Sequence, residues 1–283
     1  MKFSQWFNKN SSSEEAKPRV LPVGLHNPPF ISFVAESSNG KTRDHNEDSI
    51  YTFIKRQLTG KGVGSLGLFM VADGMGGHVN GELASKTAVE TASRYLLNEL
   101  IEPLHGGQLK NDEALILQAI EKAFLLAQEA VLSKAQGSGT TLTLLMVADA
   151  DVYYGHVGDS RLYAQTRAEG LQCLTTDHSL VRRLIDLGQI DAAAARSHPQ
   201  RNILFRALGQ GDGFKVDLGS LQLCDAATFL LCSDGLWGLV EHNLLARYLR
   251  PGRQNEETAR RLVALANEAG GTDNISAIVI TVS

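Results

Sequence analysis

Two strand-like segments lie so close together in the sequence that they restrict how the chain can fold. Residues 141–149 (TLTLLMVAD) and 151–159 (DVYYGHVGD) are both rich in apolar residues, and only Ala150 separates them. A parallel pair would need a crossover of a dozen or more residues, so these segments predict a hairpin in an antiparallel sheet. Similar apolar segments predict four more strands, at 31–36, 65–73, 228–234 and 274–282.

Two long segments have apolar residues at helical spacing. Residues 81–100 and 112–132 are predicted helices, and the Gly-Gly-Gln at 106–108 between them favours a helix hairpin lying on a sheet. Shorter helices are predicted at 179–187, capped by Thr176-Asp177, and at 256–269. Consecutive strands beside paired helices favour antiparallel sheets with helices outside over a regular βαβ alternation.

Composition narrows the class of protein. The 283 residues are 43% hydrophobic and 20% charged, which is typical of a globular chain with a substantial core. A formal net charge of −4 argues against a nucleic-acid binder. Three cysteines are too few for a disulfide framework. Because we find neither a signal-peptide pattern nor a membrane-spanning apolar run, we expect a cytoplasmic protein without membrane partners, with residues 1–30 as a flexible tail.

Aspartates stand at the ends of several predicted strands. Asp73 and Asp234 each end an apolar segment and precede a glycine, Asp159 ends a third, and Asp273 begins the last. Each alone could be a turn residue. Brought together at one edge, they would form an oxygen-rich site for Mg²⁺ or Mn²⁺. Gly74, which lacks a Cβ, could then bring its carbonyl close to a cation.

Eight short motifs occur in order along the chain, although the first, taken alone, could be a solvated loop. They are RDHNED (43–48), DGMGGHVNGELAS (73–85), SGTT (138–141), GHVGDSR (155–161), TDHSL (176–180), RNILFRALG (201–209), LLCSDGLW (230–237) and GGTDNIS (270–276). Together they resemble the metal-dependent protein phosphatase family (PPM, type 2C) in its bacterial form. The resemblance covers about residues 31–283.

The resemblance implies a fold and an activity. The fold would be α+β, a four-layer α-β-β-α sandwich of two antiparallel sheets flanked by helix pairs, with a binuclear metal site at one end. Residues 31–283 would form the catalytic domain, with a flap-like insertion at about 175–210. The activity would be hydrolysis of phosphoserine and phosphothreonine by metal-activated water. Partners would be phosphorylated proteins, among them a cognate Ser/Thr kinase, and the enzyme would be monomeric.

The resemblance also assigns roles to individual residues. Asp73 would bridge two Mn²⁺ or Mg²⁺ ions. Asp234 and Asp273 would complete the ligand shell of one ion, and Glu47 with the Gly74 carbonyl would bind the other.

Three further roles follow from the same resemblance. Asp159 with Asp234 would match a third, weaker metal position. Asp48 would hold metal-bound water, and Arg43 would bind the substrate phosphate through its guanidinium fork. Eukaryotic relatives carry a histidine, proposed as general acid, where this chain has Met75. The nearest histidine, His78, is more readily a structural loop residue, so the proton donor stays unassigned.

Other classes of function fit less well. AESSNGKT (35–42) matches a relaxed phosphate-loop pattern, but it leads into the strand-like SIYTFI instead of a helix. A cysteine phosphatase needs an arginine six positions after its cysteine, and the three cysteines are followed there by Ser179, Leu230 and Gly238. A pseudophosphatase scaffold is the main alternative, and the presence of every expected metal ligand argues against it. Trp237 is predicted to pack beside the site.

Overall fold

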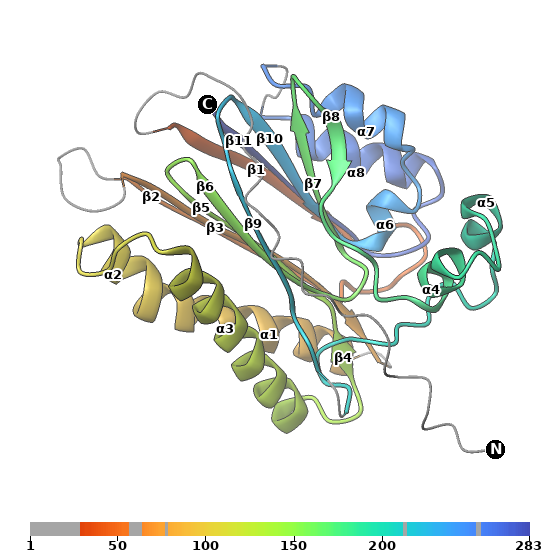
Figure 1. Ribbon diagram of the computed structural model, residues 1–283. Coiled ribbons are helices and arrows are strands. Elements are labelled where there is room, and N and C mark those ends of the chain that lie inside the picture. Colours follow the sequence, from red (N-terminus) through yellow and green to blue (C-terminus); the bar gives the residue numbers. More distant parts are fainter. Residues whose placement is uncertain (1–28, 57–63, 77–78, 212–213, 253–255) are drawn as a thin grey trace.

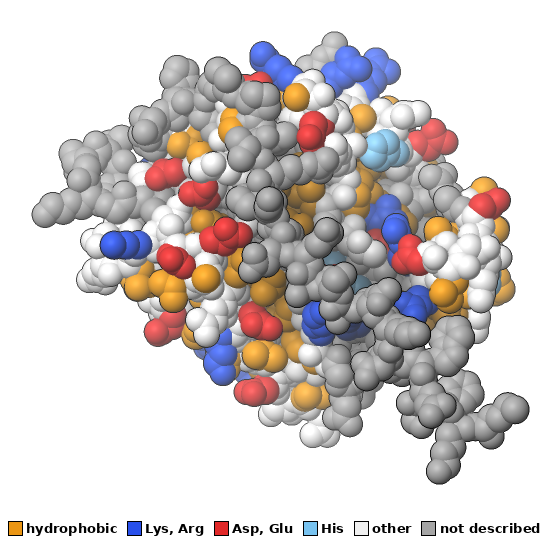
Figure 2. Space-filling view, in the orientation of Figure 1, with side chains coloured by type: hydrophobic (Ala, Val, Ile, Leu, Met, Phe, Trp, Pro, Cys, Tyr) orange, Lys and Arg blue, Asp and Glu red, His pale blue; other side chains and the backbone are white. Residues whose placement is uncertain are grey.

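Two antiparallel sheets face each other in the computed structural model, which describes residues 29–56, 64–76, 79–211, 214–252 and 256–283 (Figure 1). The predicted flexible tail, residues 1–30, lies outside these ranges except for residues 29 and 30. His78, predicted to be a structural loop residue, also lies outside them. No helix among the described residues is long and apolar enough to span a membrane. On the face shown in Figure 2, acidic and basic side chains are interspersed, as the small net charge leads us to expect.

The first sheet contains the predicted hairpin. Leu142 pairs with Val157 and Ala148 with Asp151, and the turn residue Asp149 has a positive φ of 53°. Its strands, in spatial order, are β2 (Asp48–Arg56), β3 (Ser65–Met75), β5 (Leu142–Ala148), β6 (Asp151–Val157) and β9 (Asp217–Gln222), and β4 (Gly139–Thr140) pairs with the end of β3.

The second sheet places the two chain-terminal strands of the domain side by side. Ile31 in β1 pairs with Val282 in β11, which in turn pairs with β10. The spatial order is β1 (Ile31–Ser38), β11 (Ile275–Val282), β10 (Ala227–Cys232), β7 (Arg161–Thr166) and β8 (Gly170–Cys173).

Helices cover the outer face of each sheet (Figure 1). The first sheet carries a pair formed by α1 (Val79–Leu96) and α3 (Glu113–Lys134), with the short π-helix η2 (Leu97–Ile101) and the short α-helix α2 (Glu102–His105) between them. The second carries α6 (Asp234–Trp237), α7 (His242–Tyr248) and α8 (Thr258–Glu268). The short helices α4 (Leu180–Asp186) and α5 (Ala192–Arg196) project to one side, between β8 and β9.

Successive side chains of β3 point to opposite faces of the first sheet, so this strand contributes to two different apolar layers. In β3, Phe69 faces the layer between the sheets, whereas its neighbours Leu68 and Met70 face the layer under α1 and α3. Phe229 in β10 completes the central layer, and all four side chains are fully buried. Gly155 lets α3 approach the sheet, because a Cβ there would lie 2.7 Å from the Phe124 ring.

Two local expectations need correction. The helix α4 is capped by Ser179, whose hydroxyl accepts from the Arg182 N–H, and not by Thr176-Asp177. Asp177 instead pairs with Arg161, and this long-range contact outweighs local capping. The predicted strands at 151–159 and 228–234 end at Val157 and Cys232, so Asp159 and Asp234 lie just beyond the strands, at one common edge of the sandwich.

Candidate active site

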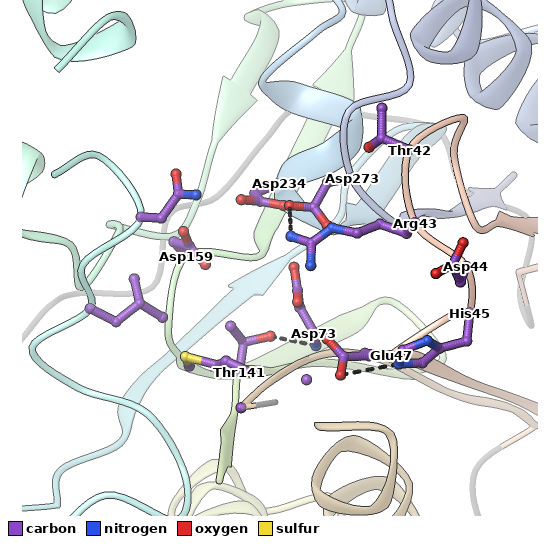
Figure 3. Close-up of a pocket in the computed structure, with 15 residues that line it drawn as sticks. Thr42, Arg43, Asp44, His45, Glu47, Asp73, Thr141, Asp159, Asp234 and Asp273 are labelled. Carbon is purple, nitrogen blue, oxygen red and sulfur yellow. Dashed lines mark hydrogen bonds and ion pairs between the residues drawn. The ribbon is translucent and has the colours of Figure 1, made fainter. Parts of the chain in front are cut away.

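One pocket collects the acidic residues that the sequence singles out (Figure 3). Its cavity of about 490 Å³ opens where β3, β6 and β10 end and β11 begins. The structure brings seven of the eight predicted site residues into its lining, and the eighth, Asp48, lies half-buried at the start of β2, opposite Asp73. The seven are Arg43, Glu47, Asp73, Gly74, Asp159, Asp234 and Asp273.

Asp73 is held by hydrogen bonds to its own backbone N–H and its own backbone carbonyl. Its N–H donates to the Thr141 hydroxyl at 2.8 Å, and its carbonyl accepts from the Thr141 N–H at 2.9 Å. The Thr140 hydroxyl also donates to that carbonyl, at 2.9 Å. The SGTT motif therefore clamps the residue predicted to bridge two metals, a role that the sequence alone did not reveal.

Glu47 is held through its backbone by hydrogen bonds with Gly74, Ser85 and Asn274. Its carbonyl accepts from the Gly74 N–H at 3.1 Å and from the Ser85 hydroxyl of α1 at 2.6 Å. Its own N–H donates to Asn274 Oδ1 at 2.8 Å. Gly81 leaves room for the carboxylate, because a Cβ there would lie 2.7 Å from Glu47 Oε1. These contacts give Gly74, Gly81 and Ser85 of residues 73–85 a role beside Glu47.

Burial and crowding keep several carboxyls close to protonation. Burial, reinforced by Asp234 and Asp273, raises the pKa of Asp48 to about 7. Burial, with the charge of Asp273, raises the pKa of Asp234 to about 6. The pKa values of Asp73 and Asp159 rise well above their usual range for the same two reasons, burial first and neighbouring acids second.

Arg43 supplies positive charge to this acidic pocket. Its Nη2 lies 2.9 Å from Asp273 Oδ2, and its side chain is 47% exposed. It also interacts electrostatically with Glu47 and Asp73. The guanidinium therefore sits at the pocket mouth, where solvent and a ligand can reach it.

The donor set fits a hard divalent cation in its chemistry. Among the described residues, no three His, Cys, Asp or Glu side chains already converge closely enough to form a metal site. The oxygens nevertheless suit Mg²⁺ or Mn²⁺. Asp48 Oδ1 and Asp234 Oδ1 are buried and find no hydrogen-bond partner in the described part of the chain, and an unsatisfied buried oxygen normally has a ligand or water.

Two other residues of the lining bear on earlier expectations. Met75 lines the pocket, and His45 lines it as well, with Nε2 at 3.4 Å from Glu47 Oε1. Sequence reasoning did not single out His45. The phosphate-loop interpretation is wrong, because residues 39–47 form a loop that enters β2 and opens no helix.

Comparison with known proteins agrees with this fold and pocket. Residues 38–268 match the family described as protein phosphatase 2C. The serine/threonine phosphatase stp of Listeria monocytogenes is 34% identical over 244 residues, which cover 86% of this chain and 93% of the relative.

Solved structures extend the comparison. The serine/threonine phosphatase of S. agalactiae superposes with a TM-score of 0.75 at 27% identity, covering 89% of this chain and 99% of that one. The catalytic domain of PstP in complex with two manganese ions gives a TM-score of 0.72 at 30% identity, covering 89% and 98%.

Fold and pocket together define a protein phosphatase built on a two-sheet sandwich. The chain belongs to the protein phosphatase 2C family. The predicted family, enzyme class and α+β sandwich are thereby confirmed.

Proposed function

We propose that this protein hydrolyses phosphoserine and phosphothreonine in proteins and needs two Mn²⁺ or Mg²⁺ ions per site. The observation that carries the proposal is the gathering of five predicted acidic site residues and Arg43 in one pocket of a protein phosphatase 2C fold. The relatives are serine/threonine phosphatases, and the PstP catalytic domain binds two manganese ions.

The acidic residues would divide the metal binding among them. Asp73, fixed by Thr141, would bridge both ions. Asp234 and Asp273 would complete one shell, and Glu47 with the Gly74 carbonyl would complete the other. Asp159 and Asp234 would share a third, weaker ion. When bound, such ions lower the pKa of water and offset charge on phosphoryl oxygens.

Arg43 and Asp48 would act on substrate and water. The exposed guanidinium can exchange Asp273 for two phosphate oxygens, which its planar fork fits. Asp48 has one oxygen fixed by the Ser233 hydroxyl at 2.7 Å, while its Oδ1 has no partner among the described residues. That oxygen can accept a hydrogen bond from the attacking water and hold it in line.

Residues 175–210 would serve as a flap that contacts the protein substrate. Asn202 and Leu204 of this segment line the pocket. Between and beyond them, Ile203 and Phe205 are 46% and 54% exposed, although both are large and apolar. They would contact residues that flank the phosphorylated side chain.

The enzyme would be monomeric and cytoplasmic. Its substrates would be phosphorylated proteins, among them a cognate Ser/Thr kinase. The test uses purified protein, Mn²⁺, p-nitrophenyl phosphate and a phosphothreonine peptide. We expect turnover of both that EDTA abolishes. Turnover that survives EDTA would contradict the metal mechanism, and no turnover at all would favour the pseudophosphatase alternative.

A further inference from the structure

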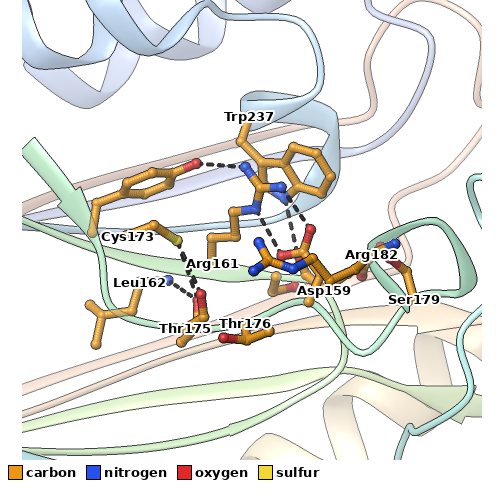
Figure 4. Close-up of polar contacts among 12 residues, drawn as sticks. Asp159, Arg161, Leu162, Cys173, Thr175, Thr176, Ser179, Arg182 and Trp237 are labelled. Carbon is orange, nitrogen blue, oxygen red and sulfur yellow. Dashed lines mark hydrogen bonds and ion pairs between the residues drawn. The ribbon is translucent and has the colours of Figure 1, made fainter. Parts of the chain in front are cut away.

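The indole of Trp237 connects the two loops that carry Asp159 and Asp234. The one-turn helix α6 begins at Asp234 and ends at Trp237. Trp237 Nε1–H donates to the backbone carbonyl of Asp159 at 3.0 Å (Figure 4). The helix that presents one carboxylate is therefore tied to the backbone of the other.

Arg161 fixes the indole from its face. The guanidinium carbon lies 3.5 Å from the centre of the Trp237 ring, a cation–π contact. Arg161 Nε and Nη2 donate to the two oxygens of Asp177 at 2.8 and 2.7 Å, and Nη1 donates to the Tyr163 hydroxyl at 3.0 Å. Because these contacts determine its orientation, the guanidinium forms a rigid backing for the ring.

The hydrogen bond from Trp237 to Asp159 opposes electrostatic repulsion between the carboxylates of Asp159 and Asp234. Asp159 and Asp234 both line the pocket; Asp159 is buried, and Asp234 is half-buried with its Oδ1 enclosed. Two negative charges at low dielectric repel each other, so their loops would tend to separate. A hydrogen bond from one loop to the backbone of the other resists this separation and leaves both carboxylates free for a ligand.

We propose that Trp237 is a positioning residue that holds Asp159 beside Asp234 so that the two can share a divalent cation, with Arg161 keeping the indole in place. This rests on the proposed function, because the cation is what the carboxylates would share. It goes beyond the packing role that the sequence predicts for Trp237, since a packing residue needs its ring but not its N–H.

The variant Trp237→Phe separates these two roles. Phenylalanine keeps an aromatic ring under Arg161 and removes the donor to Asp159. Arg161→Lys is the second variant, because an ammonium keeps the charge but cannot make the fork to Asp177. The matched control is Arg182→Met, which removes an arginine of the neighbouring α4 that pairs only at the surface with Asp186, at 2.9 Å.

The test is Mn²⁺ binding to the full chain by titration calorimetry, with thermal unfolding as a check on folding. We expect Trp237→Phe to remain folded and to bind the weakest Mn²⁺ ion about two- to tenfold less tightly, as loss of one hydrogen bond predicts. Arg161→Lys should weaken the same ion, and Arg182→Met should match wild type.

The possible outcomes are distinct. Folded Trp237→Phe that binds every Mn²⁺ ion with wild-type affinity would overturn the positioning role while leaving the proposed function intact. Equal weakening of all ions would also overturn it, because that pattern indicates general loosening. Wild-type protein that binds no Mn²⁺ would refute the proposed function itself, and the positioning role with it.

Discussion

Asp48 and Asp73 lie directly opposite each other in the antiparallel pair of β2 and β3. Like charges at facing positions destabilise a ladder, and both residues are half-buried. The Ser233 hydroxyl offsets part of the repulsion by donating to Asp48. Asp234 adds to the repulsion, because its charge raises the pKa of both carboxyls. A proton or a cation can relieve what remains, and the first two predictions below follow from this competition.

Asp234→Asn should separate stability from activity. At pH 7.5 the metal-free variant should melt at a higher temperature than wild type, because a buried charge is gone. Phosphatase activity should fall about 100-fold or more, as loss of a principal electrostatic group at a reaction centre usually causes. Asp44→Asn, an exposed aspartate of the same pocket, is the control and should change neither property. A metal-free Asp234→Asn that melts below wild type would contradict the expectation.

Stabilisation by Mn²⁺ should increase with pH between 5.5 and 8. The folded-state pKa values of Asp48 and Asp234 are raised to about 7 and about 6, so the stability gained from their protonation is present at low pH and lost as pH rises through those values. A cation must displace these protons. The Mn²⁺-induced rise in Tm, measured by calorimetry, should therefore be larger at pH 8 than at pH 5.5, and a pH-independent rise would count against displacement.

Arg43→Ala should weaken substrate binding more than it disturbs the fold. Loss of charged hydrogen bonds to phosphate corresponds to about 1.5–3 kcal/mol, which predicts a KM for p-nitrophenyl phosphate about 10- to 100-fold higher. Arg43→Lys should recover only part of this loss, because an ammonium lacks the fork. Steady-state kinetics at saturating Mn²⁺ would measure both, and an unchanged KM would exclude phosphate binding by Arg43.

Gly74→Ala should strain the contact between β3 and α1. The added Cβ would lie 2.2 Å from the Gly81 carbonyl oxygen and 2.7 Å from that of Glu47. Such overpacking costs about 1–3 kcal/mol. Urea denaturation should show this loss of stability for Gly74→Ala but not for Gly211→Ala, where a Cβ meets no described atom within 4 Å. Equal stability of the two variants would argue against a tight contact.

Replacing Ile203 and Phe205 together by serine should affect protein substrates selectively. Both side chains are exposed beside the pocket lining, so the KM for a phosphothreonine peptide should rise while turnover of p-nitrophenyl phosphate stays within about twofold, the range usual for surface substitutions. Leu187→Ser, at the C-terminal end of α4 and 56% exposed, is the control. Equal losses on both substrates would contradict a flap.

Strands that carry their own signal could be predicted from sequence. The interior segments around Phe69, Leu145 and Phe229 are continuous apolar runs, and their burial on both faces explains that pattern. By contrast, β8 and β9 are short, outer strands with mostly half-buried residues. Local sequence does not distinguish such edges from loops.

The composition of the site was predictable, but its internal contacts were not. Aspartate after an apolar run is visible in sequence, whereas the pairing of Asp48 with Asp73 depends on strand register. The clamp from Thr141 to Asp73 and the tie from Trp237 to Asp159 both span more than 60 residues. Ser179 and not Asp177 caps α4, because Asp177 pairs with Arg161 of β7.

The pocket draws its acidic residues from both sheets, and this determines when it can exist. Asp73 belongs to β3 of one sheet, whereas Asp234 and Asp273 flank β10 and β11 of the other. Either sheet alone would hold only part of the donor set. The complete donor set therefore exists only once the two sheets have docked, and a cation shared across them should slow their separation during unfolding.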